Sequence, residues 1–166
     1  DVKGLGFCVT IEHAEFMCRY FNEHGIPSMY LTGASPDEER KSAKESLVSG
    51  KVRFIFVVDI YNEGVDIPEV NTVLFLRPTE SSTIFIQQLG RGLRKYPGKD
   101  YVTILDFIGN NYKRSVHIAL ALGSLSKNSI LEKKLLKSMI LNDFKPLGLD
   151  SYGVKISIDS LSKEEI

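Results

Sequence analysis

Short apolar runs alternate with segments of helical spacing along the first 107 residues of the chain. The run over residues 5–11 is broken only by Thr10, and this pattern predicts a buried strand. A helix is predicted next, ending at Gly25, because apolar residues recur at helical spacing: Ala14, Met17, Cys18 and Phe21. The chain therefore begins with a strand followed by a helix.

A second strand and helix follow the same order. Residues 28–31 form a short strand pattern, and a helix start comes next. Ser35 is expected as the N-cap, with Pro36 in the first helical position and Glu38 three residues after the cap. Gly50 is expected to close this helix.

Three further apolar runs, at residues 53–58, 72–76 and 101–107, are rich in β-branched and aromatic residues and predict strands. They lack polar alternation, which indicates strands covered on both faces. Strands that alternate with helices imply a mostly parallel central sheet in a three-layer α/β domain. In such sheets ligands bind beyond the carboxyl ends of the strands.

The remainder of the chain has helical spacing over residues 110–123 and 128–142. Between Lys113 and Lys145 it holds seven Lys or Arg against two acids. This excess could lie along a nucleic-acid backbone, or it could be a solvated helix face. We expect a domain over residues 1–122 and a helical C-terminal extension over 123–166 that packs on the rest of a parent protein.

Composition narrows the class of protein. A chain of 166 residues with 43% hydrophobic residues can bury a core without disulfides. Its 21 basic and 21 acidic residues give no net charge, so a polyanion such as a nucleic acid would have to bind to a local cluster of basic residues. Cys8 and Cys18 and the three histidines form no metal-ligand pattern. No apolar run approaches the length of a membrane span, and nothing at the start of the sequence resembles a signal peptide. We expect a cytoplasmic protein with reduced thiols and no metal, and, since it begins at Asp1 in mid-pattern, a fragment of a longer chain.

Two polar segments stand out. The loop DIYNEGVDIP, residues 59–68, carries three acids and Gly64 directly after a buried strand, and Asp66 could accept hydrogen bonds from a ribose. In the predicted helix that contains QQLGRGLRK, Gln87, Arg91 and Arg94 share one stripe, which suits a phosphate group. Taken singly, an ordinary polar turn and an ordinary amphipathic helix explain these segments as well.

Together, DIYNEGVDIP and IFIQQLGRGLR resemble motifs V and VI of superfamily 2 helicases, which lie in the second RecA-like domain of those proteins. The order of GFCVTI, YLTG, FIFVVDIYNEGVD and QQLGRGLR agrees with that domain over about residues 4–122. The resemblance implies a three-layer RecA-like fold.

The resemblance also implies roles for single residues. Arg94 takes the arginine-finger position and Arg91 lies beside it on the γ-phosphate, while the other matched nucleotide contacts are Gln87, Gly64 and Asp66. The positions that match contacts to the nucleic-acid backbone are Thr10, Thr32 and Gly33.

The chain departs from the family pattern at two positions. Val58 stands where many relatives have a Thr that contacts nucleic-acid phosphate, which leaves that contact to backbone amides or to Asn62. Gln88 stands where other branches have a further arginine. The pattern is closer to the DNA translocases related to type III restriction subunits than to DEAD-box RNA proteins.

No phosphate-binding loop of the form G-x-x-x-x-G-K-[ST] is present. The nearest match, Gly98-Lys99-Asp100, has Leu93 in place of the first glycine and an Asp in place of the Ser or Thr, and is expected to be a turn. The chain thus holds half of a nucleotide site. ATP and Mg²⁺ would be bound mainly by an N-terminal RecA-like domain of the same parent chain.

We therefore expect the second motor domain of an ATP-dependent helicase or translocase, acting on DNA rather than RNA, with no membrane partner and with no activity in the isolated fragment. Two other classes of protein remain open. One is a non-catalytic nucleic-acid or protein-binding module that retains the fold. The other is a single-domain phosphotransferase or phosphatase, which the lack of a phosphate loop and of a plausible nucleophile disfavours.

Overall fold

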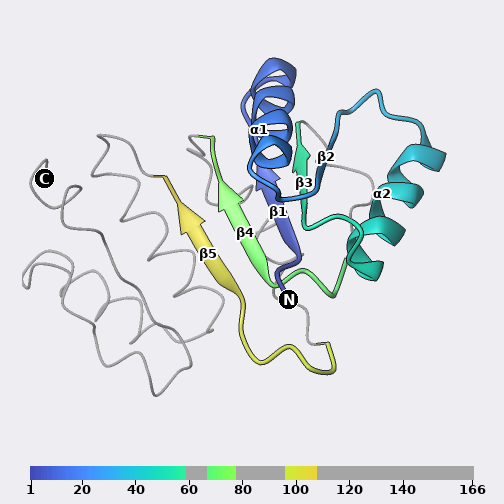
Figure 1. Ribbon diagram of the computed structural model, residues 1–166, viewed down its shortest axis with the longest axis vertical. Coiled ribbons are helices and arrows are strands. Elements are labelled where there is room, and N and C mark those ends of the chain that lie inside the picture. The colour runs from blue at the N-terminus through green and yellow to red at the C-terminus, as the bar shows by residue number, and fades with distance from the viewer. Residues whose placement is uncertain (59–66, 78–95, 108–166) are drawn as a thin grey trace, which may run out of the picture. The chain divides into compact units, whose positions relative to one another are not determined.

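The computed structural model describes residues 1–58, 67–77 and 96–107, all of which belong to one compact unit of the chain. Their order along the chain is β1 (Gly4–Phe7), α1 (Ile11–Glu23), β2 (Ser28–Leu31), α2 (Asp37–Ser49), β3 (Phe54–Val57), β4 (Thr72–Phe75) and β5 (Thr103–Asp106), as Figure 1 shows. The predicted boundary at residue 122 lies outside these ranges and stays a prediction.

The five strands form one sheet in the order β2-β3-β1-β4-β5, and every neighbouring pair is parallel. In register, Gly6 of β1 lies between Phe56 of β3 and Leu74 of β4. The predicted parallel sheet is confirmed. Because all strands run the same way, their carboxyl ends meet at one edge, which is the upper edge in Figure 1.

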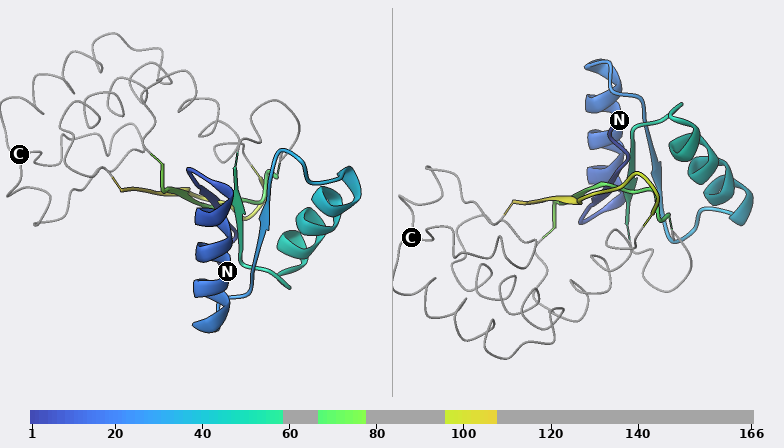
Figure 2. Two further views of the ribbon diagram at one scale, coloured as in Figure 1. Left: turned by 90° about the horizontal axis from the view of Figure 1, so that it is seen from above. Right: turned by 90° about the horizontal axis from the view of Figure 1, so that it is seen from below.

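The two helices lie on opposite sides of β2 and β3, as Figure 2 shows. Helix α1 packs against β2 and β3, and α2 packs against β3. All four residues of β3 are buried, because a helix covers each of its faces. The predicted three-layer α/β arrangement is confirmed, and it explains the lack of polar alternation in β3. The expectation of cover on both faces is wrong for β5, where Leu105 is 47% exposed.

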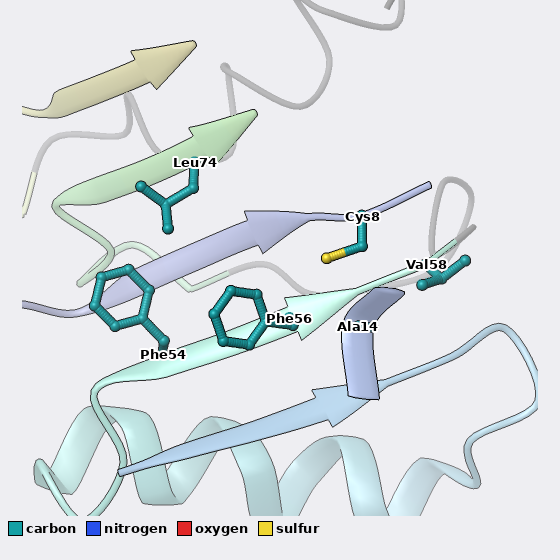
Figure 3. Close-up of a cluster of buried hydrophobic side chains, with 6 residues drawn as sticks. All are labelled: Cys8, Ala14, Phe54, Phe56, Val58 and Leu74. Atoms are coloured by element: carbon teal, nitrogen blue, oxygen red, sulfur yellow. The ribbon is translucent and has the colours of Figure 1, made fainter. Parts of the chain in front are cut away.

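Aromatic rings dominate the side of the sheet that faces α1. Figure 3 shows Phe54, Phe56 and Leu74 within a buried cluster that also holds Cys8, Ala14 and Val58. The ring of Phe21 on α1 meets the rings of Phe54 and Phe56 edge-on, with centroids 5.1 and 5.0 Å away. Glycine is required beside these rings, because a Cβ at Gly4 would overlap Phe54 and one at Gly6 would overlap Phe56.

The C-terminal ends of α1 and α2 follow the prediction, and the start of α2 does not. Gly25, which follows α1, and Gly50, which caps α2, both have positive φ, at 73° and 81°. The N-cap of α2 is Pro36, not Ser35, and it makes no side-chain cap hydrogen bond. The reason is that the Ser35 hydroxyl accepts a hydrogen bond from the backbone N–H of Thr32 and is used in the preceding loop.

Several strands are shorter than the apolar runs that predicted them. The run over residues 5–11 divides at Thr10, because Ile11 is the first residue of α1. Tyr101, predicted to lie in the last strand, is 77% exposed and precedes β5. Neither of the described helices is both long and apolar enough to cross a membrane.

Candidate functional site

Three of the residues predicted to contact a ligand lie at the carboxyl edge of the sheet. Thr10 follows β1, and Thr32 and Gly33 follow β2. Strand β3 lies between β1 and β2, so the two segments are separated by two strand spacings, about 10 Å. They therefore line the edge at two points and can meet an extended ligand.

Thr10 is exposed and also stabilises the start of α1. Its Oγ1 accepts a hydrogen bond from the backbone N–H of His13 at 3.2 Å, which makes Thr10 the N-cap of α1. Sequence reasoning assigned it a ligand contact and missed this role. The signal was available, because a Thr immediately before a helical apolar pattern is a typical N-cap.

Glu12 in the first turn of α1 adds to this cap. The pKa of its carboxyl group is lowered, first by its own backbone N–H and then by the side chain of Thr10. The carboxylate therefore stays ionised next to the partial positive charge of the helix N-terminus. The start of α1 thus combines a side-chain cap from Thr10 with an acidic residue in its first turn.

The segment from Thr32 to Ser35 is closed by three internal hydrogen bonds. The backbone N–H of Thr32 donates to the Ser35 hydroxyl at 3.2 Å, and the Ser35 N–H donates back to the Thr32 carbonyl at 3.1 Å. The Thr32 hydroxyl accepts from the Ala34 N–H at 3.2 Å. These bonds fix the backbone around the exposed Gly33.

Arg40 on α2 fixes the same segment from outside. Its Nη2 donates to the Gly33 carbonyl and its Nε donates to the Ser35 carbonyl, both at 2.9 Å. Two carbonyls held by one planar guanidinium give the loop a defined shape. Sequence reasoning did not single out Arg40, since no local pattern shows that a helix side chain reaches back to the loop before it.

Val58, the departure from the family pattern at the end of β3, is 4% exposed and belongs to the core that faces α1. Its side chain cannot reach a ligand at the edge. Its backbone N–H donates to the Leu31 carbonyl at 3.1 Å. The buried Val58 side chain therefore cannot contact a nucleic acid.

The other predicted site residues lie outside the described part of the chain: Asn62, Gly64, Asp66, Gln87, Arg91 and Arg94. Their roles stay predictions. In the described ranges no group of His, Cys, Asp and Glu residues could hold a metal ion. Hydroxyl groups and backbone amides at this edge suit contacts to the sugar and phosphate of a nucleic acid rather than metal binding.

Neither cysteine resembles a nucleophile. Both thiols are free, and burial raises the pKa of Cys8 to about 12. Burial also raises the pKa of Cys18, whose Sγ lies 3.3 Å from the Ser28 carbonyl. A reactive cysteine needs the opposite shift, toward the thiolate.

Residues 1–96 match the family described as "Helicase conserved C-terminal domain". The chain is 34% identical over 105 residues to IRC3 of Saccharomyces cerevisiae, which is named as a candidate ATP-dependent helicase. That match covers 63% of this chain and 15% of IRC3. UvrABC system protein B of Kosmotoga olearia is 33% identical over 119 residues, a match that covers 69% of this chain and 18% of that protein. The chain thus spans less than a fifth of the length of these relatives.

Solved structures of DEAD-box proteins share the fold. The C-terminal domain of the DEAD-box protein Dbp5 has a TM-score of 0.60 at 18% identity, and the match covers 82% of each chain. The yeast DEAD-box splicing factor Prp28 has a TM-score of 0.61 at 18% identity, with 96% of this chain and 33% of that chain covered. At these identities the likeness concerns the architecture of the domain.

Proposed function

The chain belongs to the helicase conserved C-terminal domain family, and on that premise we propose that it is the second motor domain of an ATP-dependent DNA helicase or translocase. The family match over residues 1–96 is the observation that carries the proposal. The relatives are several times longer than this chain, so the proposal concerns a longer parent protein.

ATP and Mg²⁺ are bound mainly by another domain of the parent in this proposal. Arg94 is the arginine finger, Arg91 contacts the γ-phosphate, and Gln87, Gly64 and Asp66 contribute nucleotide contacts. A guanidinium in this position acts on the charge that develops on the transferred phosphoryl group. The support is the order and spacing of these residues in the sequence, together with the family match.

The carboxyl edge of the sheet is the proposed track for the nucleic-acid backbone, with contacts from Thr10, Thr32 and Gly33. The hydrogen bonds that hold Thr32 and Gly33 in place support this, because a preorganised loop loses little conformational entropy on binding. DNA is proposed as the substrate because the motif V and VI segments resemble those of the DNA translocases related to type III restriction subunits more closely than those of DEAD-box RNA proteins.

Replacing Arg94 in the full-length parent tests the nucleotide role. Arg94→Ala should lower the nucleic-acid-stimulated ATP turnover by about 10³-fold or more, since arginine fingers contribute about 10³ to 10⁵ in rate. Nucleic-acid affinity without ATP should stay nearly unchanged. Arg94→Lys should restore little, because a point charge cannot reproduce the planar fork of donors.

Arg53→Ala is the matched control, because Arg53 is exposed and precedes β3 at the amino end of the sheet. It should retain the stimulated ATPase, and the melting temperatures of all three variants should be similar. If Arg94→Ala keeps full ATPase and loses nucleic-acid binding, Arg94 contacts the strand and its assignment to the nucleotide is wrong.

A further inference from the structure

Lys99 joins two turns that are far apart in the sequence. Its Nζ donates hydrogen bonds to the backbone carbonyls of Pro68, at 2.6 Å, and Val70, at 3.1 Å. Both contacts are part-buried and span 31 and 29 positions of the sequence, respectively. One side chain therefore holds the turn before β4 against the turn before β5.

Each of the two turns is closed by its own backbone hydrogen bond. The Val70 N–H donates to the Ile67 carbonyl at 3.1 Å, and the Lys99 N–H donates to the Tyr96 carbonyl at 3.0 Å. Gly98 has a φ of 81°, which turns the chain so that Lys99 faces residues 67–70. The ammonium group is thus the cross-link between two preformed turns.

Burial and a neighbouring carboxylate act in opposite directions on the charged form of Lys99. Burial lowers the pKa of Lys99, and the neighbouring Glu69 opposes that shift. One carboxylate oxygen of Glu69, Oε2, is buried without a hydrogen-bond partner in the described part of the chain. Replacing Lys99 by an apolar residue would remove the charge that compensates Glu69 and leave the two carbonyls without this donor.

The position of the two turns in the sequence gives the cross-link a functional meaning. Residues 67–70 begin directly after Asp66, the last predicted contact of the first polar segment. The turn that starts at Tyr96 begins two residues after Arg94, the last predicted contact of the second. In the sequence, each described turn therefore joins a predicted nucleotide-contacting segment to the strand that follows it, β4 or β5.

We propose that Lys99 is a positioning residue that sets the spacing between the Gly64/Asp66 segment and the Arg91/Arg94 segment by holding together the turns in which they end. The inference rests on the proposed function, because it assigns both segments to one nucleotide. Lys99 itself touches neither ATP nor nucleic acid in this account. Its role is to keep two sets of contacts in register, where a displacement on the order of 1 Å can lower a rate about 100-fold.

The test compares Lys99→Met, Lys99→Arg and Lys3→Met in the full-length protein. Lys3 is the matched control, because its Nζ also donates to a distant backbone carbonyl, that of Val48 at 2.8 Å, in a part-buried contact across 45 residues. That contact ties β1 to the end of α2 and involves neither turn. Both methionine variants keep a long apolar stem and lose an ammonium group from a part-buried contact, so their effects on the melting temperature should be alike.

Lys99→Met should lower kcat for stimulated ATP hydrolysis by about 10-fold or more and should speed amide hydrogen exchange over residues 59–71 and 87–99. Lys3→Met should do neither, and Lys99→Arg should restore most of kcat, because a guanidinium can also donate to two carbonyls.

The inference is overturned if Lys99→Met and Lys3→Met have the same kcat while Arg94→Ala lowers it. If Arg94→Ala leaves kcat unchanged, the proposed function is what fails. Hydrogen exchange then decides on Lys99 alone: faster exchange in both segments supports the cross-link, and unchanged exchange refutes it.

Discussion

Thr10 shows how one hydroxyl group can serve the fold and still lie at a ligand-facing edge. Its Oγ1 accepts from the His13 N–H, and its side chain also lowers the pKa of Glu12. Both interactions belong to the start of α1. The family resemblance assigns Thr10 a contact with the nucleic-acid backbone, so loss of the side chain would affect stability and binding together.

Substituting Thr10 in two ways separates these roles. Thr10→Ala should lower the free energy of unfolding by about 1 kcal/mol, the usual cost of losing an N-cap. Thr10→Asp should keep the stability, because Asp caps helices as well as Thr, but should weaken nucleic-acid binding, because the carboxylate repels phosphate. Chemical denaturation and a binding titration measure the two effects. If Thr10→Asp leaves the nucleic-acid affinity unchanged, Thr10 acts as a helix cap and does not contact the nucleic acid.

The packing of α1 on the sheet depends on two glycines in β1. Gly4 and Gly6 lie beside Phe54 and Phe56, whose stacked rings, with centroids 6.1 Å apart, occupy the space that two side chains would need. This makes the layer between α1 and the sheet an aromatic one. The sequence shows both the glycines and the phenylalanines, but only the register of β1 with β3 places them side by side.

Gly6→Ala should therefore destabilise the domain by about 1 to 3 kcal/mol, the typical cost of overpacking a core. Combining it with Phe56→Leu should cost less than the sum of the two single changes, because the smaller side chain leaves room for the new methyl group. Unfolding free energies from denaturant titrations of the three variants check this. Strict additivity would show that the added methyl group does not meet the Phe56 ring.

At the scale of the whole molecule, the strand order β2-β3-β1-β4-β5 determines which segments share an edge. The segments after β1 and β2 lie at the carboxyl ends of strands that flank β3. The turns joined by Lys99 lie at the opposite end, before β4 and β5. The proposed nucleic-acid contacts and the proposed positioning contact are thus on different edges of one sheet.

The isolated chain of 166 residues should neither hydrolyse ATP nor bind it tightly. The sequence contains no phosphate-binding loop, and the proposed arginines complete a site whose main binding surface is elsewhere. Phosphate release by the purified chain and a titration with a fluorescent ATP analogue measure the two properties. Sustained turnover that survives removal of contaminating ATPases would contradict a two-domain site.

Local patterns in the sequence were sufficient for the order of the described elements, the parallel sheet and the resemblance to a helicase domain. Apolar periodicity and β-branched content report on each segment by itself, and so β2 was predicted at its observed residues. The start of α2 was predicted wrongly, because a serine hydroxyl can either cap a helix or close a loop. The hydrogen bond from the Thr32 N–H places the Ser35 hydroxyl in the loop.

Only the tertiary structure decided the contacts between distant residues. Nothing near Lys99 in the sequence indicates that its ammonium group reaches Pro68 and Val70, and nothing near Arg40 shows that it fixes the loop around Gly33. Such hydrogen bonds form because the sheet brings separate segments together, and a local pattern carries no information on which segments those are. The sequence by itself determined the elements and the candidate residues, and folding determined which side chains hold them in place.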